Sequence, residues 1–136
     1  MRDFSTEFMP HRPPMLLVDD LLESDATGGV AIVQIRPDNI FLNTAGVLSP
    51  AALVEFMAQS FAATEAYQAF LAGIIKPGGY LVGLDHIDFH QEVRIGDMLT
   101  AKVLMDGRID RVCLVRGEVH KGEILIAAGK FRLFSF

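Results

Sequence analysis

The stretch SPAALVEFMAQSFAATEAYQAFLAG, residues 49–73, decides the fold. It predicts one long helix, because Ser49 is a favoured N-cap residue, Pro50 suits the first helical position and Gly73 suits the residue just after a helix. Its larger apolar residues recur at helical spacing, and alanines fill most of the remaining positions. A helix that is apolar nearly all round is buried, so the rest of the chain is expected to wrap it.

Two polar side chains interrupt this apolar helix on one face. Glu55 and Gln59 are four residues apart, so they are neighbours on the helix surface. A carboxylate inside a buried helix is costly unless it is paired or used in chemistry. Glu55 is therefore a candidate general acid or base, and the alternative is a structural glutamate held by hydrogen bonds. Gln59 is expected either to add simple polarity to the helix or to hydrogen-bond Glu55 or a bound substrate.

Composition describes a globular chain with one domain. The sequence has 136 residues, 51% of them hydrophobic, with no internal repeats or linker, so we expect a single domain over residues 1–136. The net charge of −5 argues against a nucleic-acid partner, and no apolar run is long enough to cross a membrane. The single cysteine, Cys113, allows no internal disulfide and favours a reducing cytoplasm. The positive mean hydropathy, +0.34, favours a dimer that hides apolar surface.

The strands are predicted from apolar segments between turn residues, and residues 80–93 alternate clearly. Six segments are expected to be strands: residues 15–24, 30–36, 80–93, 98–105, 111–120 and 123–136. Turns are expected at Gly28-Gly29 and at Asp106-Gly107, and short turns make the last three strands an antiparallel meander. Two strands, a long helix and four antiparallel strands give an α+β layout, with one helix packed on one curved sheet. This is the hotdog architecture.

Several motifs, in this order, resemble those of the 3-hydroxyacyl-(acyl carrier protein) dehydratases of the hotdog superfamily. The opening segment PHRPPMLLVD, residues 10–19, resembles the family's first motif. LVEFMAQ, residues 53–59, resembles the start of the family's central helix, where the glutamate is catalytic. Gly83-Leu84-Asp85 with Phe89, and then Gly96-Asp97, are similar to the strand and turn that follow. Within the superfamily, the chain most resembles the small dehydratase-like proteins of bacterial polyene pigment clusters.

This resemblance implies elimination of water from a 3-hydroxyacyl thioester, without a cofactor. The substrate would be carried on the phosphopantetheine of an acyl carrier protein or of coenzyme A. A backbone N–H at the helix N-terminus would polarise the thioester, because unsatisfied donors and the helix dipole favour negative charge there. The family's site lies at a dimer interface, with the acidic residue from one subunit and a histidine from the other. We therefore expect a homodimer joined edge to edge through residues 80–90.

Two of the family's catalytic elements are altered in this chain. The family's histidine lies in a His-Phe-Pro-Gly segment just before the helix, and the corresponding loop here, residues 41–48, contains no histidine. The position of the family's donor glycine is taken by Pro50, which has no N–H, so the donor would be Ala51 or Ala52. Asn43 is a candidate neutral donor in place of the histidine, and the alternative is an ordinary turn asparagine.

Among the histidines, His86 is the best candidate for the missing imidazole. Its segment is expected to run along the dimer axis near the partner's helix, and the alternative is a polar residue at a partly wet interface. His90 and His120 lie next to turns, where solvation is expected. His11, in the opening segment, is expected to hold backbone in place and not to do chemistry. No histidine or carboxylate pair has the spacing of a metal site.

Three functions remain open from the sequence. The first is dehydration of a 3-hydroxyacyl chain on a carrier protein. The second is a hotdog thioesterase in which Glu55 activates water, which the missing histidine favours because a single carboxylate suffices there. The third is a catalytically silent subunit that pairs with an active dehydratase or binds acyl chains.

Overall fold

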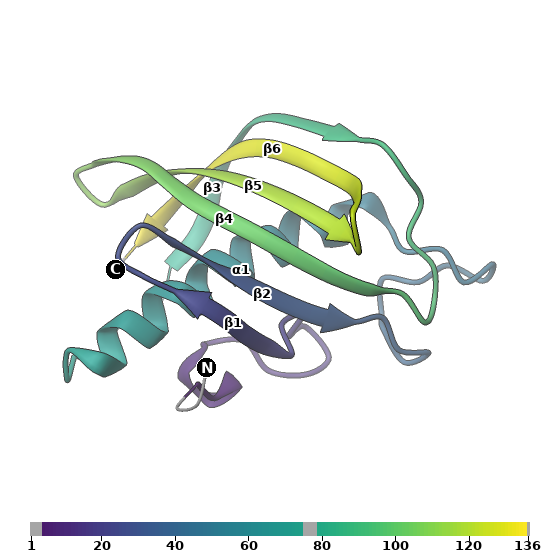
Figure 1. Ribbon diagram of the computed structural model, residues 1–136, viewed down its shortest axis with the longest axis horizontal. Helices are drawn as coiled ribbons and strands as arrows, with labels where there is room; N and C mark the ends of the chain where they lie inside the picture. Colours follow the sequence, from purple (N-terminus) through teal and green to yellow (C-terminus); the bar gives the residue numbers. More distant parts are fainter. Residues whose placement is uncertain (1–3, 75–78, 136) are drawn as a thin grey trace.

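A computed structural model describes residues 4–74 and 79–135, with one long helix against one face of a curved sheet (Figure 1). In chain order the elements are η1 (Thr6–Phe8, a 3-10 turn), β1 (Asp20–Ser24), β2 (Gly28–Gln34), α1 (Pro50–Leu71), β3 (Gly79–Phe89), β4 (Met98–Ile109), β5 (Val112–Lys121) and β6 (Ile124–Ser135). The six-stranded sheet has the order β1-β2-β4-β5-β6-β3, and all paired strands are antiparallel. The predicted hotdog architecture is confirmed.

The helix α1 begins and ends where its sequence predicts. Ser49 occupies the N-cap with extended backbone, and Pro50 is the first helical residue. Gly73, at φ +71°, adopts the left-handed backbone just after the last turn, a conformation that costs glycine little. The helix buries residues around most of its circumference, so it is covered by the sheet on one side and needs further cover on another.

The N-terminal residues provide that cover, and they run beside α1 along the lower part of Figure 1. Phe8 stacks on Phe70 of the helix, with ring centroids 4.5 Å apart, and Phe4 lies against Tyr67 at 6.3 Å. Farther along, Leu17 is buried in the core. The opening segment therefore runs along α1 before the chain enters the sheet at β1.

Two predicted turns lie at other positions in the structure. The chain turns at residues 25–27, not at Gly28-Gly29, because the Asp25 carboxylate accepts hydrogen bonds from the N–H groups of Thr27 and Gly28. Asp106-Gly107 is a bulge within the β4–β5 pair, and β4 continues to Ile109. The reversal there occurs beside Asp110, whose φ is +56°.

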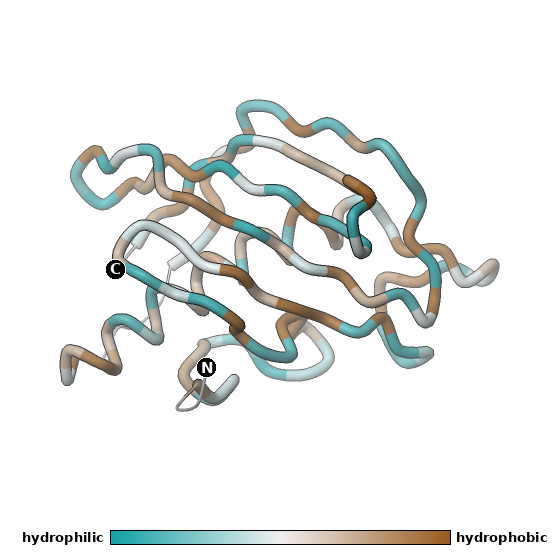
Figure 2. The backbone as a smooth tube through the Cα atoms, viewed as in Figure 1, coloured by the Kyte–Doolittle hydropathy of each residue, from teal (hydrophilic) through white to brown (hydrophobic). Residues whose placement is uncertain are grey.

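Buried and exposed residues alternate along β4 and β5, so their side chains point alternately to the two faces of the sheet. Figure 2 colours the chain by hydropathy. On β4, Leu99, Ala101 and Val103 are buried beneath α1, whereas Lys102 and Leu104 are exposed on the opposite face. We call this opposite side, away from α1, the outer face. On β3 the alternation is interrupted by register shifts at residues 81–83 and 84–86. Side-chain direction along β3 therefore does not follow the simple alternation predicted for residues 80–90.

Candidate active site

A cavity of about 190 Å³ lies between α1, the opening segment and the ends of β3 and β6. Much of its lining is apolar or aromatic, including Phe8, Phe61, Ala62, Tyr80, Leu133 and Phe134. His11, Glu55 and Gln59 line the same cavity. An apolar hollow with a few convergent polar groups is the usual form of a ligand site.

Gln59 connects the opening segment to the helix. It is fully buried, its Oε1 accepts a hydrogen bond from the Leu17 N–H at 2.7 Å, and its Nε2 donates to the Met15 carbonyl oxygen at 2.9 Å. The same Nε2 donates to Glu55 Oε1 at 3.0 Å, so the amide uses both of its N–H bonds and its oxygen. These bonds fix one oxygen of Glu55. The same bonds explain why the strand predicted from residue 15 begins only at Asp20. The Gln59 side chain occupies the Leu17 N–H and the Met15 carbonyl oxygen, which a neighbouring strand would otherwise bond.

His11 is the ionisable side chain that the fold brings to Glu55. Its Nε2 lies 3.7 Å from Glu55 Oε1, and the two side chains are 25% and 31% exposed. This distance is too long for a direct hydrogen bond, but it is short enough for one water or hydroxyl group to contact both atoms. The sequence assigned His11 a backbone-holding role, which Arg12 performs instead: its guanidinium donates to the carbonyl oxygens of Glu7, Met9 and His11.

The environment of His11 favours the neutral imidazole. Burial lowers its pKa below the ordinary value of 6.5, and the negative charge of Glu55 opposes this shift. Its Nδ1 is buried without a hydrogen-bond partner among the described residues. An imidazolium would carry an N–H at that atom with no acceptor, which adds to the cost of charging the ring. At neutral pH the site therefore holds an uncharged imidazole whose Nε2 faces a glutamate.

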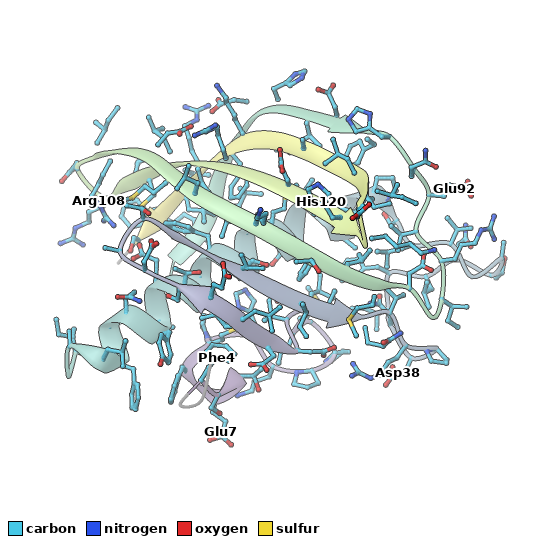
Figure 3. All side chains as sticks on the ribbon, in the orientation of Figure 1. Phe4, Glu7, Asp38, Glu92, Arg108 and His120 are labelled. Carbon is cyan, nitrogen blue, oxygen red and sulfur yellow. The ribbon has the colours of Figure 1, made fainter. Side chains whose placement is uncertain are left out.

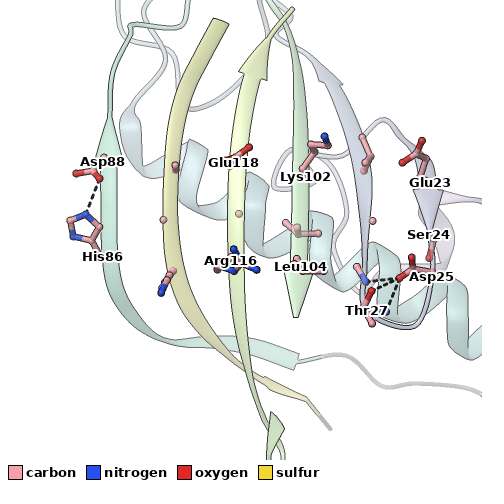
Figure 4. A pocket seen from close by; sticks show the side chains of 18 residues that line it. Glu23, Ser24, Asp25, Thr27, His86, Asp88, Lys102, Leu104, Arg116 and Glu118 are labelled. Atoms are coloured by element: carbon pink, nitrogen blue, oxygen red, sulfur yellow. Dashed lines mark hydrogen bonds and ion pairs between the residues drawn. The ribbon is translucent and has the colours of Figure 1, made fainter. Parts of the chain in front are cut away.

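His86 lies away from this cavity. It projects from β3 on the outer face, its side chain is 68% exposed, and its Nε2 is bonded to Asp88 at 2.8 Å (Figure 4). The next residue, Ile87, packs inward on the core. A dimer that continues the sheet across β3 puts both helices on one face and both copies of His86 on the other. The structure therefore does not bring His86 together with Glu55, and gives no support to it as the missing imidazole.

The groove in which His86 lies is also unlike the cavity beside Glu55. It is an open hollow of about 970 Å³ across the outer face, between β1 and β3. Charged side chains such as Lys102, Arg116 and Glu118 line it (Figure 4). Although this groove is the larger of the two hollows, the helix and its carboxylate lie on the other side of the sheet, so we place the chemistry in the smaller cavity.

Asn43 shapes its own loop. Its Oδ1 accepts hydrogen bonds from the N–H groups of Ala45 and Val47, at 2.9 and 3.0 Å. Its backbone N–H also donates to the Val47 carbonyl oxygen. These contacts are those of a turn asparagine, the alternative that the sequence left open, and Asn43 is not among the residues that line the cavity.

Ala51 lies one helical turn before Glu55, on the same face of α1. The other expected donor, Ala52, is buried, and its N–H donates to the Ser49 carbonyl oxygen at 3.0 Å. Ala51 is exposed. Of the two first-turn donors considered for a thioester oxygen, Ala51 is therefore the accessible one.

The described ranges, residues 4–74 and 79–135, contain neither a metal-ligand cluster nor a membrane-spanning helix. No group of three His, Cys, Asp or Glu side chains within these ranges is arranged to hold a metal ion. None of their helices combines the length and the apolar character needed to span a membrane.

The fold and the site define a hotdog protein whose central helix presents a glutamate to an apolar cavity. Comparisons with known proteins identify its family. A family model described as ApeP-like, ApeP dehydratase, matches residues 5–136. The 3-hydroxyacyl-(acyl-carrier-protein) dehydratase FabZ of Bordetella pertussis is 31% identical over 134 residues, which cover 90% of this chain and 86% of that protein. The chain belongs to the ApeP-like dehydratase family.

Solved structures agree with the fold. The dehydratase heterocomplex ApeI:P from Xenorhabdus doucetiae contains a chain that superposes with a TM-score of 0.88 at 18% identity, covering 95% of this chain and 88% of that one. The uncharacterized protein PH1136 from Pyrococcus horikoshii superposes with a TM-score of 0.69 at 17% identity, covering 91% and 87%. At these identities the likeness concerns the fold.

The surroundings of His11 predict its titration. We expect NMR to give His11 a pKa below 6.5, because burial disfavours the charged ring. In Glu55→Gln the His11 pKa should fall further, since the carboxylate that attracts the imidazolium is removed. A pKa of 6.5 or above in the wild type, or an increase in the variant, would contradict the described environment.

Proposed function

We propose that this protein eliminates water from a 3-hydroxyacyl thioester carried on an acyl carrier protein, in fatty-acid-like or polyketide-type biosynthesis. The observation that carries the proposal is Glu55, a partly exposed carboxylate that Gln59 holds at an apolar cavity. Membership of a dehydratase family supports the reaction, and the name of the FabZ relatives supports the substrate class.

The reaction needs a base at C2 of the acyl chain and a donor at the thioester oxygen. Glu55 supplies the base, because its carboxylate lines the cavity with one oxygen already oriented by Gln59. Removal of the C2 proton develops negative charge on the thioester oxygen. The Ala51 N–H, in the first turn of α1, is our proposed donor, and the helix dipole stabilises negative charge at that end.

The rest of the cavity suits the acyl chain. Its lining beyond the polar residues is largely aromatic and aliphatic, which favours a hydrocarbon over a charged ligand. Gly79, Tyr80 and Leu81 of β3 form part of this lining, so the acyl chain would lie beside an edge of the sheet. An assembly formed across β3 would therefore complete the wall of the site.

We propose that β3 is the edge through which two copies of the chain pair. β3 has 11 residues and β1, at the other edge, has five. Five large apolar side chains of β3 are at least 37% exposed: Tyr80, Leu81, Val82, Leu84 and Phe89. A long apolar edge is normally covered by another strand. Because the ApeI:P structure is a heterocomplex, the alternative partner is a related dehydratase subunit. The cytoplasm is the proposed location, since the single cysteine, Cys113, is buried and fits a reducing compartment.

Light scattering tests this pairing. A homodimer would have twice the chain mass of 14.9 kDa. Val82→Lys, which places a charge on the apolar edge, should shift the protein toward the single-chain mass. Leu104→Lys is the matched control, because Leu104 is similarly exposed but lies on β4 in the middle of the sheet. A wild-type protein that stays at 14.9 kDa would exclude the homodimer.

Glu55→Gln tests the reaction itself. The substitution keeps the shape of the side chain but cannot take a proton, so we expect the dehydration rate to fall by about 10²–10⁴-fold with the circular dichroism spectrum unchanged. The assay follows 3-hydroxyacyl, enoyl and saturated acyl thioesters of a carrier protein by mass spectrometry. Glu118→Gln, on the outer face, is the control and should retain the wild-type rate.

The products separate the competing functions. Interconversion of the hydroxyacyl and enoyl thioesters with loss of water supports dehydration. Hydrolysis of all three thioesters would instead identify a thioesterase, and no reaction with any of them would identify a silent subunit. If Glu55→Gln dehydrates at the wild-type rate, the carboxylate is structural and the proposed chemistry is wrong.

A further inference from the structure

We infer that His11 is the second catalytic residue, and that it forms a pair with Glu55 of the same chain. The inference rests on the proposed dehydration and adds to it the residue that binds the leaving group. The family that the sequence resembles takes its histidine from the other subunit, out of the loop before the central helix. In this chain that loop, residues 41–48, has no histidine.

The elimination can be written with Glu55 as the only group that exchanges a proton with the substrate. The ionised carboxylate takes the C2 proton, the electron pair of that C–H bond forms the C2–C3 double bond, and the C3–O bond breaks. The carboxylic acid so formed gives its proton to the departing hydroxyl, which leaves as water, and the carboxylate is restored. The hydroxyl group must therefore be held beside Glu55, which requires a hydrogen-bond donor close to that residue.

His11 Nε2 is in the position to be that donor. It lies 3.7 Å from Glu55 Oε1, so a hydroxyl oxygen between the two side chains is within hydrogen-bond reach of both. His11 is neutral, so it carries one N–H. The tautomer with that N–H on Nε2 is favoured, because Nδ1 is buried with no acceptor in the described structure while Nε2 faces a carboxylate.

Two sets of contacts within the chain hold the residues around His11. Gln59 donates to the Met15 carbonyl oxygen and accepts from the Leu17 N–H, and these two bonds attach the end of the opening segment to α1. Phe8, stacked on Phe70, attaches the residues just before His11 to the same helix. Because α1 also carries Glu55, one rigid element positions both members of the pair. The geometry of the pair is therefore set within one chain.

His120 provides an unusually close control for His11. Its side chain is also 25% exposed, and its Nε2 lies 3.9 Å from a glutamate carboxylate, that of Glu118. It differs in position, because it projects from β5 on the outer face, away from the cavity (Figure 3). Both histidines lie beside a glutamate, but only His11 lies at the cavity. If the cavity position matters, replacing His11 should lower the dehydration rate and replacing His120 should not.

The first experiment compares His11→Ala, His11→Gln and His120→Ala by dehydration rate and thermal stability. We expect His11→Ala to lower kcat/KM by at least about tenfold with little change in melting temperature. His11→Gln, which keeps an N–H donor, should recover part of the loss, and His120→Ala should match the wild type. If His11→Ala has the wild-type rate while Glu55→Gln is inactive, this inference is overturned and the proposed function stands. A wild-type protein that does not dehydrate any thioester overturns the proposed function instead.

The second experiment asks whether the pair belongs to one chain. His11→Ala and Glu55→Gln chains with different affinity tags are produced together, and the mixed assembly is isolated through both tags. With both residues needed in the same chain, every site in the mixed assembly lacks one member, so it should be as inactive as either variant alone. Recovery of about half the wild-type rate would show that the two residues act across the interface. If the active assembly contains only one copy of this chain, His11 and Glu55 can act together only within that copy. The loss of dehydration rate in His11→Ala then shows whether His11 takes part.

Discussion

The buried amide of Gln59 is the constraint on which the rest of the site depends. A fully buried amide must find partners for its oxygen and both N–H bonds, and Gln59 finds them in Leu17, Met15 and Glu55. Satisfying that one side chain attaches the opening segment to the central helix and orients the carboxylate in the same step. The apolar character of the surrounding helix leaves few competing partners, so this one polar pair positions the carboxylate of the proposed catalytic site.

Much of the fold was predictable because its signals are local. The helix limits follow from Ser49, Pro50 and Gly73, and the meander follows from short turns between alternating segments. The errors arise where side chains or bulges compete with the ladder. Asp25 makes its own turn, and Asp106-Gly107 has the composition of a hairpin turn but inserts a bulge into a strand that continues. The hydrophobic periodicity of the sequence does not show whether such residues form a turn or a bulge.

The site was only partly predictable, for a related reason. Glu55 and Gln59 share a helix face, so their spacing alone predicts that they are neighbours, and they are hydrogen-bonded. His11 is 44 residues from Glu55 in sequence and lies in a proline-rich segment without periodicity, so its approach depends on a tertiary path. The preference for His86 assumed that its strand would bring it near a partner's helix, but its side chain projects onto the outer face, where it is bonded to Asp88. The signal that pointed to His11 was its place inside a motif shared with dehydratases, and the backbone role assigned to it belongs to Arg12.

The most direct test of this account is the pKa of His11, measured by NMR in Gln59→Leu, with Gln68→Leu as the control. Gln68 is on the same helix, but its side chain donates to the Ser24 hydroxyl at the end of β1 and not to the opening segment. If Gln59 holds His11 against the helix, its loss releases the opening segment, His11 is hydrated, and its pKa rises toward the ordinary 6.5. The control should keep the lowered value. A folded Gln59→Leu protein in which the His11 pKa stays as low as in the wild type would contradict the account.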